Sequence, residues 1–409
     1  MLRIIPLSEA QSFITRKAVR LAEAEQTVAP ILHAVRTRGD AAVFEYARKF
    51  DGFDGTSLSV PTAGSHVSVE FLAALETASK NIREYAKTQL PRDTWTDFPD
   101  GRSLGSIVRP LDSMGAYIPA GRYPLPSTLL MTVIPAQAAE VRGICVTSPH
   151  PSPEILACAD FLGIETIFRI GGAQAIAALA FGTETIPKVD RIVGPGNIYV
   201  AAAKKLLAGE VGIDFIAGPT EIVIIANDAD PRYIASDMLA QAEHDVEASS
   251  ILLTTSRSLA ERVVKEVSRQ LETLPTAPVA CEAIRNNSAV ILCPSMDAAV
   301  EASNRLAPEH LAIYDDGLLP KIEHAGSIFV GPNSPEAAGD YATGPNHVLP
   351  TSGAARIRGG LSAADFVKVI SVQKLTAGAL IRLAPAITTL ARAEGLEAHA
   401  RSVEVRLGK

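Results

Sequence analysis

The stretch LAPEHLAIY, residues 306–314, places two candidate general bases next to each other, Glu309 and His310. An imidazole has an ordinary pKa of about 6.5 and exchanges protons at neutral pH, and a carboxylate beside it is a second proton acceptor. Pro308 is expected to end the preceding helix and to hold both side chains at its end, near the ligand crevice of a sheet. An isolated Glu-His pair could equally end a helix and face solvent. The rest of the sequence is needed to distinguish these two interpretations.

A second kind of chemistry, metal binding, is indicated by the segment LAQAEHD. Asp230 and Pro231 supply an N-cap and a first-turn proline for the helix that runs through this segment. Gln241 and His244 are three residues apart, so they are expected on one face near the C-terminal end of that helix. The pair could bind a metal ion, and it could equally be ordinary surface polar groups.

Two later segments carry further candidate ligands. The loop GDYATGPNHVLPTSGAAR holds Asp340 and His347 among glycines and prolines, a composition that fixes functional groups on a rigid backbone. The segment AEGLEAH carries Glu394 and His399 in an expected terminal helix. Each segment also has an ordinary interpretation, as a capped turn and as a solvated helix face, respectively.

Taken together, the polar segments indicate a nitrogen and oxygen metal site. Two imidazoles, a carboxylate and an amide oxygen form a ligand set suited to Zn²⁺ or a neighbouring transition metal. Thiolates are not expected in it, because the cysteines lack CxxC spacing. We expect all four to be small buried apolar groups: Cys145, Cys158, Cys281 and Cys293.

Composition excludes several classes of partner. The chain has 409 residues, 47% of them hydrophobic and 20% charged, which is enough for more than one hydrophobic core. Its net charge of -7 and scattered lysines and arginines argue against nucleic acid or an anionic membrane as a partner. The start MLRIIPLSEA lacks the features of a signal peptide, and no apolar run is long enough to cross a bilayer. A cytoplasmic protein is expected.

The order of apolar runs predicts the fold class. From residue 115 onward, short β-branched runs such as GICVTSP alternate with helical stretches such as GGAQAIAALAFG, and a second series begins at EIVIIAN. This alternation is typical of parallel sheets covered by helices on both faces. The first hundred residues and the region after about residue 360 are predicted to be helical, and the latter is too short to bury a core of its own.

Eight blocks then carry a resemblance to one enzyme family. In chain order they are YIPAGRYPLPST, GGAQAIAALAFGTE, VGPGN, AGPTE, QAEHD, APEHL, GDYATGPNHVLPT and EGLEAH. Their order and approximate spacing resemble histidinol dehydrogenase over nearly the whole length of the chain. No GxGxxG follows a predicted strand, so the usual dinucleotide fingerprint is missing, as it is in that family.

The resemblance implies roles for specific residues. It implies catalysis by Glu309 and His310 and one Zn²⁺ per subunit, bound by Gln241, His244, Asp340 and His399. The residues implied to bind substrate are Thr220, Gln241, His244, Glu309, His310, Asp340, His347, Glu394 and His399. The residues implied to contact NAD are Tyr117, Gln174 and Asn197.

The implied reaction is an NAD-dependent, four-electron oxidation of L-histidinol to L-histidine through histidinal, in histidine biosynthesis. We assign proton removal from the alcohol to His310 and activation of water for the aldehyde step to Glu309. Two alternatives stay open at this stage: a related zinc dehydrogenase of another small alcohol, and a zinc hydrolase in which Glu309 activates a metal-bound water. A non-catalytic metal- or nucleotide-binding protein would leave the Glu-His pair without a task.

The expected fold class is α/β, with two tandem incomplete Rossmann-like units on parallel sheets and helical N-terminal and C-terminal segments. The expected boundaries are 1–24 for the N-terminal helical segment, 25–117 with 220–360 for the catalytic unit, 118–219 for the cofactor unit and 361–409 for the tail. The resemblance further implies a homodimer with shared active sites, in which Glu394 and His399 reach the partner subunit.

Overall fold

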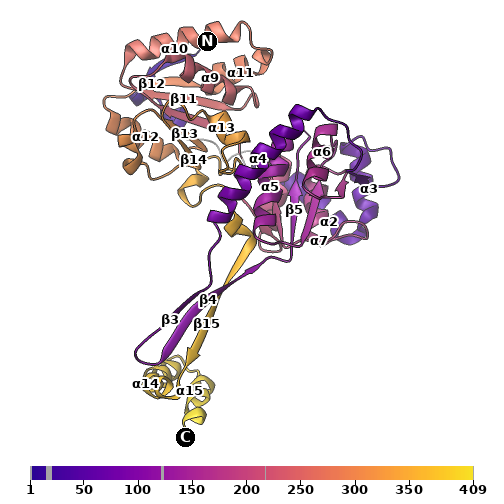
Figure 1. Cartoon of the computed structure of the whole chain (residues 1–409), viewed down its shortest axis with the longest axis vertical. Helices are drawn as coiled ribbons and strands as arrows, with labels where there is room; N and C mark the ends of the chain where they lie inside the picture. The colour runs from indigo at the N-terminus through magenta and orange to yellow at the C-terminus, as the bar shows by residue number, and fades with distance from the viewer. Residues whose placement is uncertain (1, 15–20, 121–123, 217, 409) are drawn as a thin grey trace. The chain divides into compact units, whose positions relative to one another are not determined.

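The computed structural model describes residues 2–14, 21–120, 124–216 and 218–408 (Figure 1). Two of the blocks quoted above, YIPAGRYPLPST and AGPTE, fall partly on residues 121–123 and 217, outside the described residues. The chain divides into two compact units, Met1–Gln89 with Asp112–Phe366 and Leu90–Leu111 with Val367–Lys409. Each unit is described by itself.

The first unit contains a fully parallel sheet, here called sheet A. From one edge to the other, its strands are β1 (Arg3–Pro6), β12 (Ala289–Leu292), β11 (Ser249–Thr254), β10 (Glu221–Ile225), β13 (His310–Ile313) and β14 (Ser327–Val330). Strands β10 and β11 are buried throughout. Their continuous apolar runs are what a sheet covered on both faces requires.

Helices cover both faces of sheet A. Alternate residues of a strand point to opposite faces, so Ile222 and Ile224 face α9 (Pro231–Ala242), α10 (Arg257–Leu271) and α11 (Ala277–Asn287). Val223 and Ile225 face α12 (Met296–Leu306) on the other side, near the short α1 (Gln11–Ile14). The helix α13 (Glu336–Tyr341) follows β14. Asp230 and Pro231 begin α9 as predicted, with the Asp230 side chain accepting a hydrogen bond from the Arg232 amide.

The first unit also contains a second sheet, here called sheet B. Its strands, in spatial order, are β2 (Ser59–Pro61), β7 (Thr166–Phe168), β6 (Gly143–Thr147), β5 (Ser113–Tyr117), β8 (Arg191–Val193) and β9 (Gly212–Ile213). All of them are parallel except the edge strand β2, which pairs antiparallel with β7.

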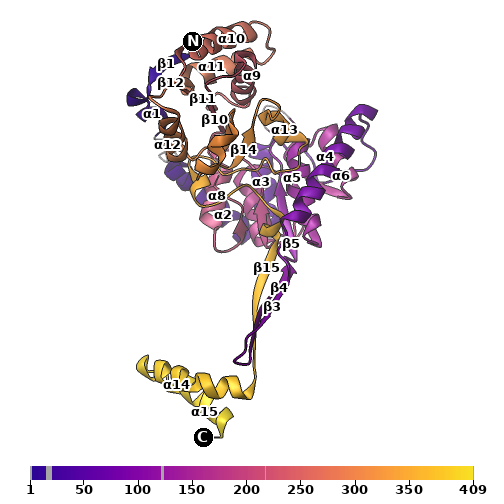
Figure 2. The same ribbon diagram turned by 60° about the vertical axis from the view of Figure 1, so that its left-hand side comes forward.

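Two helical layers enclose sheet B (Figure 2). The helices α2 (Leu21–Arg38), α3 (Asp40–Phe50), α7 (Gly172–Phe181) and α8 (Ile198–Leu207) share one apolar core. The buried helix α5 (Pro126–Ala138) packs between α4 (Val69–Thr88) and α6 (Pro153–Phe161). Pro126 and Pro153 stand in the first turns of their helices, where the missing N–H has no cost.

Both sheets have the same strand order. When the five strands from β10 to β14, or from β5 to β9, are counted along the chain, their spatial order is 3-2-1-4-5. This is the dinucleotide-binding order without its sixth strand. In each sheet an early strand, β1 or β2, is added at the edge beside the third strand. The predicted fold class, two incomplete Rossmann-like units, is confirmed.

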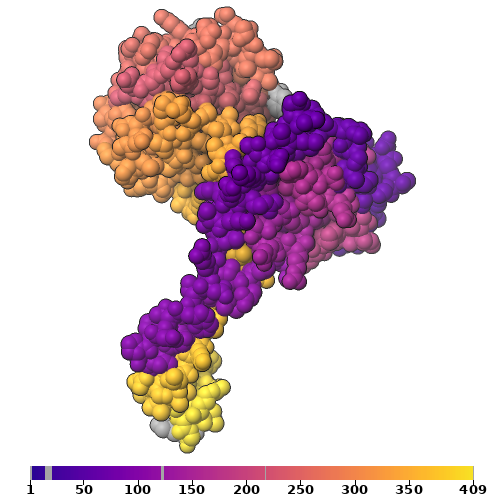
Figure 3. Space-filling view, viewed as in Figure 1, coloured from indigo at the N-terminus to yellow at the C-terminus, as the bar shows by residue number. Residues whose placement is uncertain are grey.

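The second unit is small and is built from two distant parts of the chain (Figure 3). The antiparallel strands β15 (Val367–Leu375), β4 (Arg102–Pro110) and β3 (Thr94–Asp97) form its sheet, followed by α14 (Ala377–Ala393) and α15 (Glu397–Glu404). Large apolar side chains of this unit remain exposed, including Ile381 at 59% and Leu390 at 64%. As predicted, the tail does not bury its own apolar surface.

Three of the expected boundaries differ from the structure. The N-terminal segment begins with a strand, because Arg3–Pro6 pairs with β12. Residues 25–117 do not join the sheet of residues 220–360: β5 is the central strand of sheet B, and α2 and α3 share its core. The tail begins with the nine-residue strand β15, which pairs along its whole length with β4. Pairing between distant segments leaves no local pattern in the sequence.

Short 3-10 helices complete the described chain at Leu7–Glu9, Asp316–Lys321, Ala354–Arg356, Ala363–Phe366 and Val405–Leu407. In the described part of the chain, no helix is long and apolar enough to span a bilayer. The cysteines are unpaired; Cys145, Cys158 and Cys293 are buried as predicted, whereas Cys281 is only half-buried. Burial raises the pKa of the Cys145 and Cys158 thiols to about 12, which keeps them inert.

Candidate active site

Glu309 is a buried carboxylate held on one oxygen. Its Oε2 accepts hydrogen bonds from the Thr220 hydroxyl at 2.5 Å and from the Glu221 backbone N–H at 2.9 Å. The side chain is nearly closed to solvent, and this burial raises its pKa to about 7 although His310 and the two donors oppose the shift. Both bonds fall on Oε2, which leaves Oε1 for another partner.

His310 stands among three carboxylates. Its Nδ1 lies 3.7 Å from Glu309 Oε2 and 3.3 Å from Glu336 Oε1, and its Nε2 lies 3.7 Å from Asp340 Oδ1. Burial lowers the pKa of the ring, but the charges of Glu336, Glu309 and Asp340 outweigh burial and raise it to about 10. His310 Nε2 and both oxygens of Glu336 are buried without a hydrogen-bond partner in the chain itself.

Gln241 joins this cluster through Thr220. Its Nε2 donates to Thr220 Oγ1 at 2.7 Å, while its Oε1 is buried and has no partner. An unpaired buried amide oxygen is costly, and a bound cation would satisfy it. His244 follows α9 beyond its last turn and is exposed, so it is not on the helix as expected.

The side chain of His347 contacts the backbone of Asp340. His347 Nδ1 lies 2.8 Å from the Asp340 carbonyl oxygen, and its Nε2 lies 3.4 Å from Thr128 Oγ1 in the first turn of α5. Burial raises the pKa of the Asp340 carboxyl, but His310, His347 and His244 overcome this effect and lower it. The structure therefore brings Thr220, Gln241, Glu309, His310, Asp340 and His347 into one cluster, with His244 near enough to act on Asp340.

The cluster lies at the amino edge of sheet A, not at the carboxyl-end crevice where the catalytic pair was expected. The helix α12 ends at Leu306, as Pro308 predicts, and Ala307 caps it in the left-handed region with φ 50°. The chain then turns directly into β13, whose first residue is His310. Because the pair precedes the strand rather than following it, the pair must lie at the strand's amino end.

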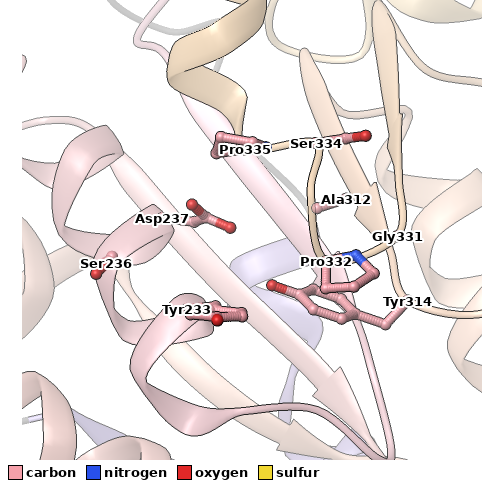
Figure 4. A pocket seen from close by; sticks show the side chains of 9 residues that line it. All are labelled: Tyr233, Ser236, Asp237, Ala312, Tyr314, Gly331, Pro332, Ser334 and Pro335. Atoms are coloured by element: carbon pink, nitrogen blue, oxygen red, sulfur yellow. The ribbon is translucent and has the colours of Figure 1, made fainter.

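The carboxyl edge of sheet A holds a pocket of about 250 Å³ instead (Figure 4). No predicted catalytic or metal-binding residue is among the described residues that line it: Tyr233, Ser236, Asp237, Ala312, Tyr314, Gly331, Pro332, Ser334 and Pro335. The expectation that the catalytic pair lies at the carboxyl edge of the sheet was therefore wrong.

The residues implied to contact NAD all lie at the carboxyl edge of sheet B. Tyr117 ends β5, Gln174 lies in the first turn of α7, and Asn197 caps α8 by accepting from the amides of Tyr199 and Val200. The Tyr117 hydroxyl accepts from the Gly172 amide at 3.1 Å. This is the edge at which open parallel sheets bind ligands, on both sides of the strand-order switch between β5 and β8.

A buried ion pair positions the glycine turn that carries Asn197. Lys204 Nζ donates to Asp214 Oδ1 at 2.7 Å and to the Gly194 carbonyl, while Asp214 Oδ2 accepts from the Gly194 amide at 2.8 Å. Gly194 has φ 117°, and a Cβ there would meet the Tyr117 carbonyl oxygen at 2.2 Å. Only glycine fits this close approach, and the ion pair holds it in place.

Sequence reasoning missed Glu336 and the Lys204–Asp214 pair. Glu336 precedes Asp340 by four residues, so the two share one helix face, and this spacing could have indicated it. Lys204 and Asp214 gave no comparable signal, because their contact spans two elements. Glu394 and His399, at the end of α14 and in α15, belong to the second unit and are exposed there.

In the described part of the chain, no three His, Cys, Asp or Glu side chains come together to hold a metal ion. The implied ligand set contains only two such side chains within the first unit, His244 and Asp340, with the amide of Gln241 beside them. A further ligand from elsewhere would be required.

Comparisons with known proteins decide the family. The family described as Histidinol dehydrogenase matches residues 14–407. Histidinol dehydrogenase of Halalkalibacterium halodurans is 48% identical over 398 residues, 94% of each chain, and that of Rhizobium meliloti is 46% identical over 411 residues, 97% of this chain and 95% of the other. The chain belongs to the histidinol dehydrogenase family.

Structural comparison agrees. The crystal structure of histidinol dehydrogenase from Elizabethkingia anophelis matches with a TM-score of 0.94 and 38% identity, over 100% of this chain and 98% of that one. An acetylating aldehyde dehydrogenase from Geobacillus thermoglucosidasius, at 14% identity and a TM-score of 0.50, shares the fold alone. Family membership makes the chain an oxidoreductase of histidine biosynthesis and favours a dehydrogenase over the zinc hydrolase.

The Lys204–Asp214 pair gives a testable expectation. Replacing Lys204 by methionine leaves Asp214 as a buried unpaired charge, which should lower the free energy of unfolding by about 3–5 kcal/mol. Lys205→Met is the matched control, because Lys205 pairs with Glu25 at the surface and its loss should cost less than about 1 kcal/mol. Urea denaturation measures both variants. Equal losses in the two variants would contradict a positioning role for the buried pair.

Proposed function

We propose that the chain oxidises L-histidinol to L-histidine through histidinal, with two NAD⁺ reduced in succession at one site. The observation that supports this most strongly is the buried Glu309–His310 pair, joined to Gln241 through Thr220 and to Asp340 through His310. The first hydride leaves the alcohol carbon and gives the aldehyde. Water then adds to the aldehyde, and the second hydride leaves the hydrate to give the carboxylate.

His310 is proposed to take the proton from the alcohol. The surrounding carboxylates raise its pKa, so the ring must release a proton before it can accept one. The proton that leaves is the one on Nε2, which faces Asp340 Oδ1 at 3.7 Å, because the nitrogen that accepts from the alcohol must first be unprotonated. Nδ1 keeps its proton, which faces the Glu221 carbonyl oxygen and Glu336 Oε1, each at 3.3 Å. Nε2 has no hydrogen-bond partner in the described chain and can then face the substrate hydroxyl.

Glu309 is proposed to activate the water that adds to histidinal. A general base works best when its pKa is near the working pH, and burial brings this carboxyl to about 7. The Thr220 hydroxyl and the Glu221 amide fix Oε2, so the water proton is expected to go to Oε1. The donors thus orient the carboxylate and leave one oxygen for chemistry.

The residues present suit a zinc ion. The unpartnered Oε1 of Gln241, the carboxylate of Asp340 and the imidazole of His244 are an oxygen and nitrogen donor set of the kind that binds Zn²⁺. We propose these three ligands and His399, with one ion per subunit. When bound, the ion would hold the imidazole and amino group of histidinol and, as a cation beside His310, favour the neutral ring.

The remaining proposed contacts complete the site. His347, Glu394 and His399 are proposed to contact the substrate, and Tyr117, Gln174 and Asn197 the cofactor. The loop that bears His347 is tied to α5 by the bond from Asn346 Nδ2 to the Met131 carbonyl oxygen at 2.6 Å. Since α5 follows β5, the last residue of which is Tyr117, this bond supports a short path from the cofactor edge to the catalytic pair.

We further propose a homodimer in which His399 and Glu394 serve the partner's site. Two observations support it: the first unit offers too few ligands for a complete zinc site, and the second unit leaves large apolar side chains exposed. A cytoplasmic location is proposed as well, which the unpaired cysteines favour because thiols stay reduced there.

The division of labour predicts different losses for two variants. Glu309→Gln should slow oxidation of histidinal far more than oxidation of histidinol to the aldehyde, by about 10²–10⁴-fold, because only the former needs an activated water. His310→Asn should slow oxidation of the alcohol. Single-turnover kinetics with each substrate separate the two steps, and equal losses of both steps in Glu309→Gln would disprove the assignment.

The zinc proposal predicts that chelation abolishes NADH formation from histidinol and that added Zn²⁺ restores it. His244→Ala and Asp340→Ala should lose bound zinc in elemental analysis while keeping a native circular dichroism spectrum. His324→Ala, outside the site, is the control and should retain the metal. Full zinc content in either ligand variant would remove that residue from the ligand set.

The dimer proposal predicts complementation between inactive chains. Mixing His244→Ala with His399→Ala under conditions that exchange subunits makes about half of the dimers mixed, and in each mixed dimer one site carries neither change. About a quarter of the wild-type activity should return. If exchange is demonstrated and no activity returns, His399 serves its own chain.

A further inference from the structure

Asp51, in the loop after α3, lies at the proposed cofactor edge of sheet B. Its Oδ2 accepts from the Gly171 amide at 3.1 Å and from Gln174 Nε2 at 3.0 Å. The negative charge of Asp51 is close enough to interact with Tyr117. His150 is in turn close enough to interact with the Asp51 carboxylate. Asp51 is thus in direct contact with one of the residues proposed to bind NAD.

This contact fixes which atoms the edge offers to a ligand. A carboxylate only accepts hydrogen bonds, so the amide of Gln174 must turn its NH₂ toward Asp51 and its Oε1 away from it. Both bonds to Asp51 use Oδ2, which leaves Oδ1 free. Gln174 is only 1% exposed, whereas Asp51 is half-buried, so Asp51 Oδ1 is the acceptor that this contact leaves for a ligand.

Two backbone donors beside Asp51 are already occupied. The amide of Gly171 bonds to Asp51, and the amide of Gly172 bonds to the Tyr117 hydroxyl. The Asp51 carboxylate adds an acceptor and a negative charge beside this turn, which suits a hydroxyl group and disfavours an anion.

The position of Asp51 matches a general requirement of dinucleotide folds. An acidic residue at the end of the second strand usually binds the adenosine ribose hydroxyls of NAD, and its charge excludes the 2′-phosphate of NADP. In sheet B the second strand is β6, and the residues after it, Ser148, Pro149 and His150, include no acid. Gly171, bonded to Asp51, packs against Pro149, so Asp51 brings a carboxylate to this end of the sheet from another segment.

We propose that Asp51 is the residue that selects NAD over NADP: its free Oδ1 accepts from an adenosine ribose hydroxyl, and its charge repels a 2′-phosphate. This rests on the proposed function, because it requires NAD to bind at the carboxyl edge of sheet B. It adds a specificity-determining residue from the loop between α3 and β2.

The test compares NAD⁺ and NADP⁺ as oxidants of histidinol. Asp51→Asn and Asp51→Ser should lower the ratio of kcat/KM for NAD⁺ to that for NADP⁺ by at least about tenfold, through KM rather than kcat. Asp51→Glu keeps the charge and should retain the preference. Asp54→Asn, an exposed change of the same charge in the same loop, is the matched control and should leave the ratio unchanged.

The unaltered enzyme supplies an independent measurement. ADP-ribose should inhibit it competitively against NAD⁺, and the 2′-phosphate of ADP-ribose should inhibit at least about tenfold more weakly. Equal inhibition by the two compounds, or an unchanged NAD⁺ to NADP⁺ ratio in both Asp51→Asn and Asp51→Ser, overturns the assignment of Asp51. If the unaltered chain reduces neither cofactor with histidinol, the proposed function itself fails, and that outcome is separate from the choice between cofactors.

Discussion

Burial of negative charge beside one imidazole is the constraint on which the site depends. Removing a carboxylate from water costs several kcal/mol, and three of them, Glu309, Glu336 and Asp340, approach His310. The cost is offset only if donors and the ring stay in fixed positions. Strands β10 and β13 provide this, since they pair in a register that sets Ile222 against His310 and leaves Thr220 and Glu221 beside Glu309. A shift of one residue would turn these side chains to the opposite face.

The two sheets share a strand order and use opposite edges. Sheet B gathers Asp51, Tyr117, Gln174 and Asn197 at its carboxyl edge, where loops lead into the N-termini of helices. Sheet A places its polar cluster at the amino edge, where helices such as α9 end and strands begin. The common fold therefore does not determine where chemistry occurs; the identity of the residues that precede each strand does.

The sequence was most informative where function depends on local order. The pair Glu309–His310 and the helix start at Asp230 were read from neighbouring residues, and the alternation of strands and helices predicted both sheets. Each polar segment alone had two interpretations, functional and structural. The resemblance to a family then favoured the functional interpretation for all of them together. What could not be read was pairing at a distance: β1 with β12, β15 with β4, and Asp51 with Gln174. Such contacts depend on the folded geometry of other segments, which periodicity does not report.

The edge strand β1 has a consequence for synthesis on the ribosome. Its partner β12 is Ala289–Leu292, so β1 leaves the ribosome long before any strand of its own sheet exists. Apart from its edge strand β2, sheet B is made from residues 113–213, with α2 and α3 already present, and it can form while β1 waits unpaired. An isolated strand with unpaired N–H and C=O groups invites wrong association during that interval. The brevity of β1, four residues ending at Pro6, limits that hazard in the nascent chain.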